Sequence, residues 1–126
     1  MYSLSLHRNF TARHFLIGGD WGAENRPHAH DYRLEVQIHG DELDPHGFLV
    51  DLVKLEEHVE ELLNGYRDRV LNELPEFSGL NPSLEHFARI VCLALDGSLQ
   101  GPGLRSLEVR IWEDANASAS YRLDRK

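Results

Sequence analysis

The strongest constraint on the fold is the strict alternation of apolar and polar side chains over residues 31–39. A period of two is typical of a strand with one buried face, because side chains two residues apart share a face. The apolar positions are Tyr32, Leu34, Val36 and Ile38. Extended backwards, the same parity includes His28 and His30, so both imidazoles are expected on the buried side, about 6.6 Å apart along the strand.

Two imidazoles at this spacing on one strand face can bind a single metal ion. Metal–imidazole bonds are strong in a water-poor setting, which is also where a catalytic zinc is usually kept. The alternative interpretation is that His28 and His30 are only polar side chains at the edge of a strand.

The first residues of the chain repeat the alternation, which only Arg8 interrupts. In phase with its apolar side is His14, and residues 15–27 contain turn signals such as Gly18-Gly19 and Pro27 that would let a second strand return antiparallel. Pairing of the two strands would bring His14 near His28 and His30. Three neutral nitrogens with an open position are typical of a catalytic zinc site, whereas structural zinc fills four positions, often with cysteine.

Two helices are expected after these strands. Asp51 is suited to cap the first, whose apolar positions follow helical spacing from Leu52 to Leu63. Asn81 is expected to cap the second, with Pro82 at its first position and Gly97 ending it. Cys92 lies beside the apolar stripe of this helix, which favours a small buried residue over a catalytic thiol.

Residues 104–112 are predicted to form a third strand, and Tyr121–Leu123 a short final strand after a loop over 116–120. Leu107, Val109 and Ile111 share the buried face, and Glu113 continues their parity. A buried carboxylate needs hydrogen-bond donors, so Glu113 lies either at the exposed end of the strand or in position to receive a ligand. The order strand, strand, helix, helix, strand, strand predicts an α+β domain over residues 1–126, with two helices on one face of a four-stranded antiparallel sheet.

Composition narrows the range of partners and compartments. The chain has 13 basic and 21 acidic residues and no clustered basic run, so binding to a nucleic-acid backbone or an anionic membrane is not expected. No signal-peptide core or long apolar run is present, and a single cysteine fits a reducing compartment. We therefore expect a cytoplasmic protein.

The motifs, taken in order, resemble those of the 6-pyruvoyl tetrahydropterin synthase family, which includes the 6-carboxytetrahydropterin synthases. The resemblance spans nearly the whole chain and preserves motif order. It rests on His14, His28-Ala29-His30, Gly47-Phe48-Leu49-Val50-Asp51, Leu71-Asn72, Asn81-Pro82-Ser83-Leu84-Glu85 and Glu113.

This resemblance implies a site and an assembly. His14, His28 and His30 match the family's Zn²⁺ ligands, and Glu113 matches the glutamate that anchors the pterin ring. The implied architecture is the tunnelling fold, in which trimers close their sheets into a barrel and stack as a homohexamer with active sites between subunits.

The departures from the family pattern concern the proton-transfer groups. Glu24 stands where the family has its catalytic cysteine. A branch of the family also carries glutamate at this position, and its members resemble enzymes that cleave dihydroneopterin triphosphate to 6-hydroxymethyl-dihydropterin. The Asp-His pair is absent: its place falls on Arg67-Asp68, or on Asp68-Arg69 if one residue is deleted. We expect Glu24 to act as the base and Asp68 as a possible second group. The alternatives are a solvated loop carboxylate for Glu24 and a surface charge for Asp68.

The expected function is thus that of a zinc-dependent lyase acting on a pterin-like small molecule. Two alternatives stay open: a family member that keeps zinc but acts on another small molecule, and a non-catalytic oligomeric scaffold.

Overall fold

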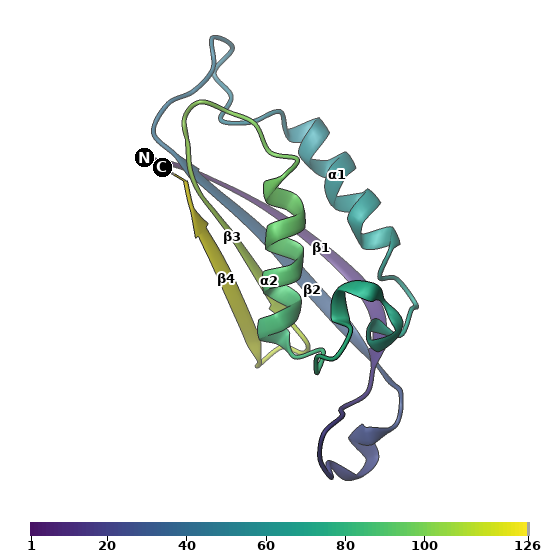
Figure 1. Cartoon of the computed structure of the whole chain (residues 1–126). Helices are drawn as coiled ribbons and strands as arrows, with labels where there is room; N and C mark the ends of the chain where they lie inside the picture. The colour runs from purple at the N-terminus through teal and green to yellow at the C-terminus, as the bar shows by residue number, and fades with distance from the viewer. Residues whose placement is uncertain (126) are drawn as a thin grey trace.

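The protein is described here by a computed structural model that covers residues 1–125. Four strands form one antiparallel sheet in the order β1-β2-β3-β4, and both long helices lie on the same face of it (Figure 1). The α+β architecture and its order are confirmed. The elements are β1 (Tyr2–His14), β2 (His28–Gly40), α1 (Leu52–Asn64), α2 (Leu84–Asp96), β3 (Leu104–Trp112) and β4 (Ser118–Asp124), with short 3-10 helices at Gly22–Asn25, Leu71–Glu73 and Pro75–Phe77.

The core lies between the sheet and the helices. Its sheet side consists of the alternating apolar residues, which meet in rows across the strands. One such row pairs Leu6 with Val36, Val36 with Val109, and Val109 with Tyr121. Val36 and Val109 are fully buried, and each such side chain contributes about 1.5–3 kcal/mol through burial. The alternation therefore fixes which face of each strand the helices cover.

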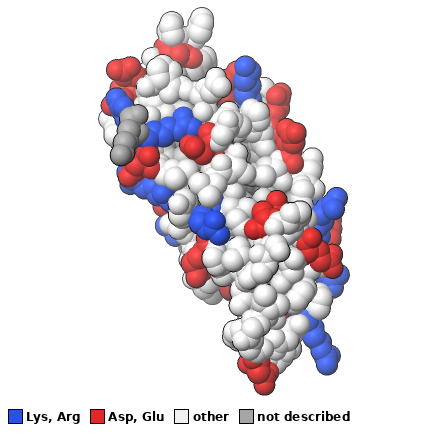
Figure 2. Space-filling model, viewed as in Figure 1, with Lys and Arg blue, Asp and Glu red and all other residues white. Residues whose placement is uncertain are grey.

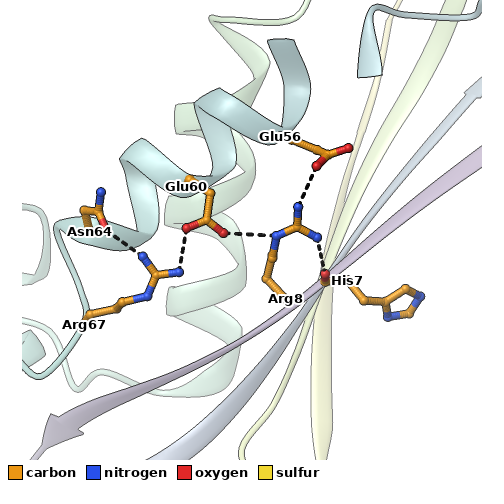
Figure 3. A network of polar contacts seen from close by, with 6 residues as sticks. All are labelled: His7, Arg8, Glu56, Glu60, Asn64 and Arg67. Carbon is orange, nitrogen blue, oxygen red and sulfur yellow. Dashed lines mark hydrogen bonds and ion pairs between the residues drawn. The ribbon is translucent and has the colours of Figure 1, made fainter. Parts of the chain in front are cut away.

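Arg8 interrupts the alternation because it pairs with α1 instead of entering the core. Its Nε and one terminal nitrogen donate to Glu60 and Glu56, both at 3.0 Å, and Arg67 donates to the other oxygen of Glu60 at 2.8 Å (Figure 3). The Arg67 and Arg8 guanidiniums hold the pKa of the Glu60 carboxyl below its ordinary value. This network connects the edge strand β1 to the helix above it.

The start of α1 is as predicted, and the start of α2 is not. Asp51 accepts a hydrogen bond from the Lys54 amide at 3.2 Å. At α2 the cap is Ser83, whose hydroxyl accepts from the His86 amide at 3.1 Å, and the helix begins at Leu84. The expectation that Asn81 caps this helix was wrong, because the Asn81 side chain is bonded to the loop that follows β1. Pro82 is likewise not the first helical residue, since it precedes the cap.

The final strand is longer than predicted. It begins at Ser118, paired with Trp112, and not at Tyr121. The turn before it is tight because the Asp114 carboxylate accepts hydrogen bonds from the amides of Asn116 and Ala117, at 2.7 and 2.8 Å. Strand pairing can therefore begin immediately after the turn.

Lys and Arg are interspersed with Asp and Glu across the face shown in Figure 2.

Of the helices in residues 1–125, none combines the length and hydropathy needed to cross a membrane. Cys92 is fully buried, and burial raises the pKa of its thiol to about 12, as expected for a structural cysteine.

Candidate metal and ligand site

Three histidines meet where β1 ends and β2 begins. His14 is the last residue of β1 and pairs with His28, the first of β2, while His30 pairs with Ala12 one step inside. One nitrogen from each ring can be chosen so that all three lie within 4.8 Å of one another. The strand pairing that the sequence indicated thus brings these three side chains together.

The electrostatics of the triad suit a metal ligand. His14 is buried, with 6% of its surface exposed, and its pKa is lowered to about 4, first by burial and then by the charges of His28 and His30. At neutral pH His14 is therefore uncharged, as a coordinating imidazole must be. His28 and His30 are half-buried, which leaves one side of the triad open to a ligand.

The donor set fits zinc. Tetrahedral zinc with Zn–N bonds of about 2.0–2.1 Å places its ligand nitrogens roughly 3.4 Å apart, so small side-chain rotations would close the observed triad around an ion. Three imidazoles with a free position match a catalytic rather than a structural zinc site. Nδ1 of His28 is 2.9 Å from the Arg26 carbonyl oxygen, and the Tyr32 hydroxyl is 3.1 Å from Nδ1 of His14.

The loop of residues 15–27, which projects past the end of the sheet in Figure 1, is held by two asparagine side chains. The Asn72 amide both accepts from and donates to the backbone of Phe15, each at 2.9 Å. Asn81 does the same for Ile17, at 2.7 and 3.1 Å. Beyond His14, these two side chains thus make the backbone hydrogen bonds that a neighbouring strand would otherwise make. We did not predict this role, although both lie in the motifs that carry the family resemblance.

Glu24 is carried by the same loop. Its carbonyl oxygen accepts a hydrogen bond from the Leu16 amide at 2.8 Å, which ties the residue back to the chain just after His14. A pocket of about 250 Å³ lies between this loop and the start of α2. Its lining residues are His14, Leu16, Glu24, His30, Pro82, Ser83, Leu84, Glu85 and Glu113.

Glu113 reaches this pocket from the end of β3. It is half-buried, and its amide donates to the Ala117 carbonyl at 3.2 Å. Of the two positions that strand parity left open, its place is thus at the wall of the histidine pocket. Glu85 lines the pocket as well, and we did not single it out as a site residue. The signal that could have found it is its place at the end of the Asn81–Glu85 motif, which carries part of the family resemblance.

Asp68 lies elsewhere. It is exposed, it has a left-handed backbone with φ of 57°, and its amide donates to the Thr11 carbonyl at 2.7 Å, on the outer edge of β1. It is not among the residues that line the pocket. Arg67, its neighbour, is occupied by Glu60 and Asn64 (Figure 3). Within one chain, therefore, Asp68 and the histidine pocket are separate.

Several known proteins are similar to this chain. A 6-carboxy-5,6,7,8-tetrahydropterin synthase of Bacillus subtilis (strain 168) is 35% identical over 79 residues, which are 61% of this chain and 52% of that protein. The match thus spans about half the length of this curated relative. The structure of Caenorhabditis elegans 6-pyruvoyl tetrahydropterin synthase has a TM-score of 0.85 at 24% identity, covering 98% of this chain and 96% of that one.

A Plasmodium vivax 6-pyruvoyltetrahydropterin synthase, solved as a mutant in which a glutamate called a catalytic residue is replaced by cysteine, has a TM-score of 0.79 at 14% identity and covers 98% of both chains. The model of the 6-pyruvoyl tetrahydropterin synthase family matches residues 3–124. A match over nearly the whole sequence, with the same fold in the solved structures, means that this chain belongs to the 6-pyruvoyl tetrahydropterin synthase family.

Proposed function

We propose that the protein is a zinc-dependent pterin lyase that acts on the side chain of a substrate resembling dihydroneopterin triphosphate. The observation that supports this most strongly is one shared pocket in a chain of this family, lined by two histidines of the triad and two separate glutamates. These residues are His14, His30, Glu24 and Glu113. Four different segments contribute these side chains, namely β1, β2, the 3-10 helix at Gly22–Asn25 and the end of β3. A structural role for any one of them would not require the others nearby.

In this proposal His14, His28 and His30 hold the metal ion as neutral imidazoles. When bound, zinc supplies a Lewis acid that polarises the oxygens of the substrate side chain and makes a neighbouring proton easier to remove. The half-buried Glu113 carboxylate accepts two adjacent N–H groups from the aminopyrimidinone edge of the ring. The ring is then fixed with its side chain directed toward the histidines and Glu24.

Glu24 is the proposed general base. It takes the proton of a side-chain hydroxyl, and the O–H electron pair forms a carbonyl as the adjacent carbon–carbon bond breaks. The electron pair of that bond passes into the conjugated ring, and the exocyclic carbon is then reprotonated. A catalytic glutamate has a parallel in the Plasmodium vivax protein, whose mutated catalytic residue is a glutamate.

Asp68 has a place in this proposal only across a subunit boundary. It lies on the outer edge of β1 at Thr11, next to the part of that edge that stays open for pairing with a second copy of the chain. We propose that it serves the pocket of the adjacent subunit, in a homohexamer whose sites are shared between subunits.

One observation favours a second candidate function, in which the same pocket acts on a different small molecule. Residues 67–69 contain two arginines and one aspartate, so the histidine of the family's Asp-His pair is missing. A substrate whose conversion needs no such relay would suit this chain equally well.

The test is to incubate the zinc-loaded protein with dihydroneopterin triphosphate and to identify the product by mass spectrometry. We expect 6-hydroxymethyl-dihydropterin and very little 6-pyruvoyl-tetrahydropterin, because the latter requires the missing proton-transfer groups. Unchanged substrate beside a fully occupied metal site would favour the second candidate. Efficient formation of 6-pyruvoyl-tetrahydropterin would contradict the role given to Glu24.

A further inference from the structure

Tyr32 lies directly behind the metal triad. It is only 1% exposed, and its hydroxyl oxygen is 3.1 Å from Nδ1 of His14, which is itself buried. The ring is fixed from two sides: it stacks on Phe10 at 5.4 Å between centroids and meets the edge of Phe87 at 5.3 Å. The packing of the ring therefore holds the hydroxyl oxygen beside Nδ1 of His14.

A neutral imidazole has one N–H and one lone pair, so the partner of one nitrogen decides what the other can do. Nδ1 of His28 faces the Arg26 carbonyl oxygen at 2.9 Å. Because a carbonyl only accepts, Nδ1 of His28 carries the hydrogen and its Nε2 has the lone pair that a metal needs. His14 has a hydroxyl in the corresponding place.

We infer that Tyr32 is a positioning residue for the metal site. Its hydroxyl oxygen accepts the Nδ1–H of His14, which keeps the Nε2 lone pair of that ring available as a metal ligand. This role rests on the proposed zinc site, and it is not required for the fold, since Phe would preserve the stacking on Phe10 and Phe87.

The surroundings of His30, the third histidine, make the Tyr32 hydroxyl more important to the metal site. Within residues 1–125, the ring of His30 makes no hydrogen bond that would select its tautomer. Without the Tyr32 hydroxyl, Nδ1 of His14 would lose its side-chain partner, whereas Nδ1 of His28 would keep the Arg26 carbonyl. Outer partners of metal-bound histidines typically change metal affinity by 10–100-fold, so we expect a loss in this range.

The test compares Tyr32→Phe with a matched control, Tyr66→Phe. Tyr66 is also buried, with 3% exposed, and its ring meets the edge of Phe87 at 5.2 Å, but it contacts none of the three histidines. Zinc dissociation constants are measured by competition with a chromophoric chelator, and metal-free stability by thermal melting. We expect Tyr32→Phe to bind zinc about 10–100-fold more weakly and Tyr66→Phe to bind it as the wild type does.

Cobalt substitution provides a second readout that packing alone would not change. The visible absorption of bound Co²⁺ should differ between Tyr32→Phe and the wild type and be unchanged in Tyr66→Phe. Equal zinc affinity in Tyr32→Phe and the wild type would overturn the role of Tyr32 alone, and so would equal weakening in both variants. A wild type that binds no zinc would overturn the metal site itself and this role with it.

Discussion

At the scale of single residues, the histidine triad makes the most direct prediction. His28→Ala removes one of the three proposed ligand nitrogens, which lie within 4.8 Å of one another, so most of the zinc should be lost. The wild type should carry about one zinc per chain by elemental analysis. His7→Ala is the matched control, because His7 is an exposed histidine on the opposite face of β1 and should leave zinc content unchanged. Equal zinc content in both variants would contradict the assignment.

Glu24 carries the prediction about chemistry. Glu24→Gln keeps the size of the side chain but removes the proton acceptor, so kcat should fall about 100-fold or more, a typical contribution for a general base. Zinc content should stay constant because Glu24 is not a proposed ligand. Glu57→Gln, an exposed change on α1, should turn over substrate as the wild type does. Unaltered turnover in Glu24→Gln would show that another residue takes the proton.

How far the site could be predicted from sequence depends on the kind of signal. The positions of His14, His28, His30 and Glu113 follow from strand parity, because a period of two determines the face of every side chain in a strand. The contribution of Glu85 depends on how the start of α2 sits against the loop, which has no periodic signal. The separation of Asp68 from the pocket likewise depends on tertiary structure.

At the scale of elements, the two asparagines that hold the loop after β1 are the features most open to test. Asn81→Ala removes two hydrogen bonds to the backbone of Ile17, which is half-buried, and should lower the free energy of unfolding by about 1–2 kcal/mol. Urea denaturation measures this, and hydrogen exchange at the Ile17 amide should accelerate. Asn116→Ala, in an exposed turn, should change neither quantity. An unchanged Ile17 exchange rate in Asn81→Ala would show that the Asn81 side chain does not hold the loop.

The same asparagine shows why an element boundary escaped prediction. Asn81 before Pro82 has the composition of a helix start, and the local rules for capping favour it. A side chain can satisfy only one set of partners, and here the backbone of Ile17, 64 residues away, takes them. Arg8 is the parallel case in β1: its break in the alternation is explained by Glu56 and Glu60 on α1. Local rules place the elements, and long-range polar contacts decide their ends and exceptions.

At the scale of the whole molecule, the sheet leaves β1 and β4 as its two edges. Unpaired edges present free backbone donors and acceptors, which another strand can satisfy. Residues 68–70 cover the β1 edge only from Thr11 to Arg13, through two backbone hydrogen bonds and an isolated bridge between Arg13 and Val70. We therefore expect the edges to pair between copies, giving a homohexamer of about six times 14.4 kDa in sedimentation equilibrium. A monodisperse monomer at micromolar concentration would contradict this assembly.

Shared sites make a further prediction, because Glu24 and Asp68 would then act on one substrate from different subunits. Glu24→Gln and Asp68→Asn hexamers should each be nearly inactive. When the two variants are unfolded together and reassembled, some sites combine an intact Glu24 from one subunit with an intact Asp68 from its neighbour. Random mixing of equal amounts should restore about a quarter of the wild-type activity, since each group is intact in half of the subunits. Asp68→Asn hexamers with full activity would remove Asp68 from the mechanism. If Asp68→Asn is inactive and no activity returns on mixing, both groups must come from the same chain. That result would contradict the separation of Asp68 from the pocket, and with it the placement of the site between subunits.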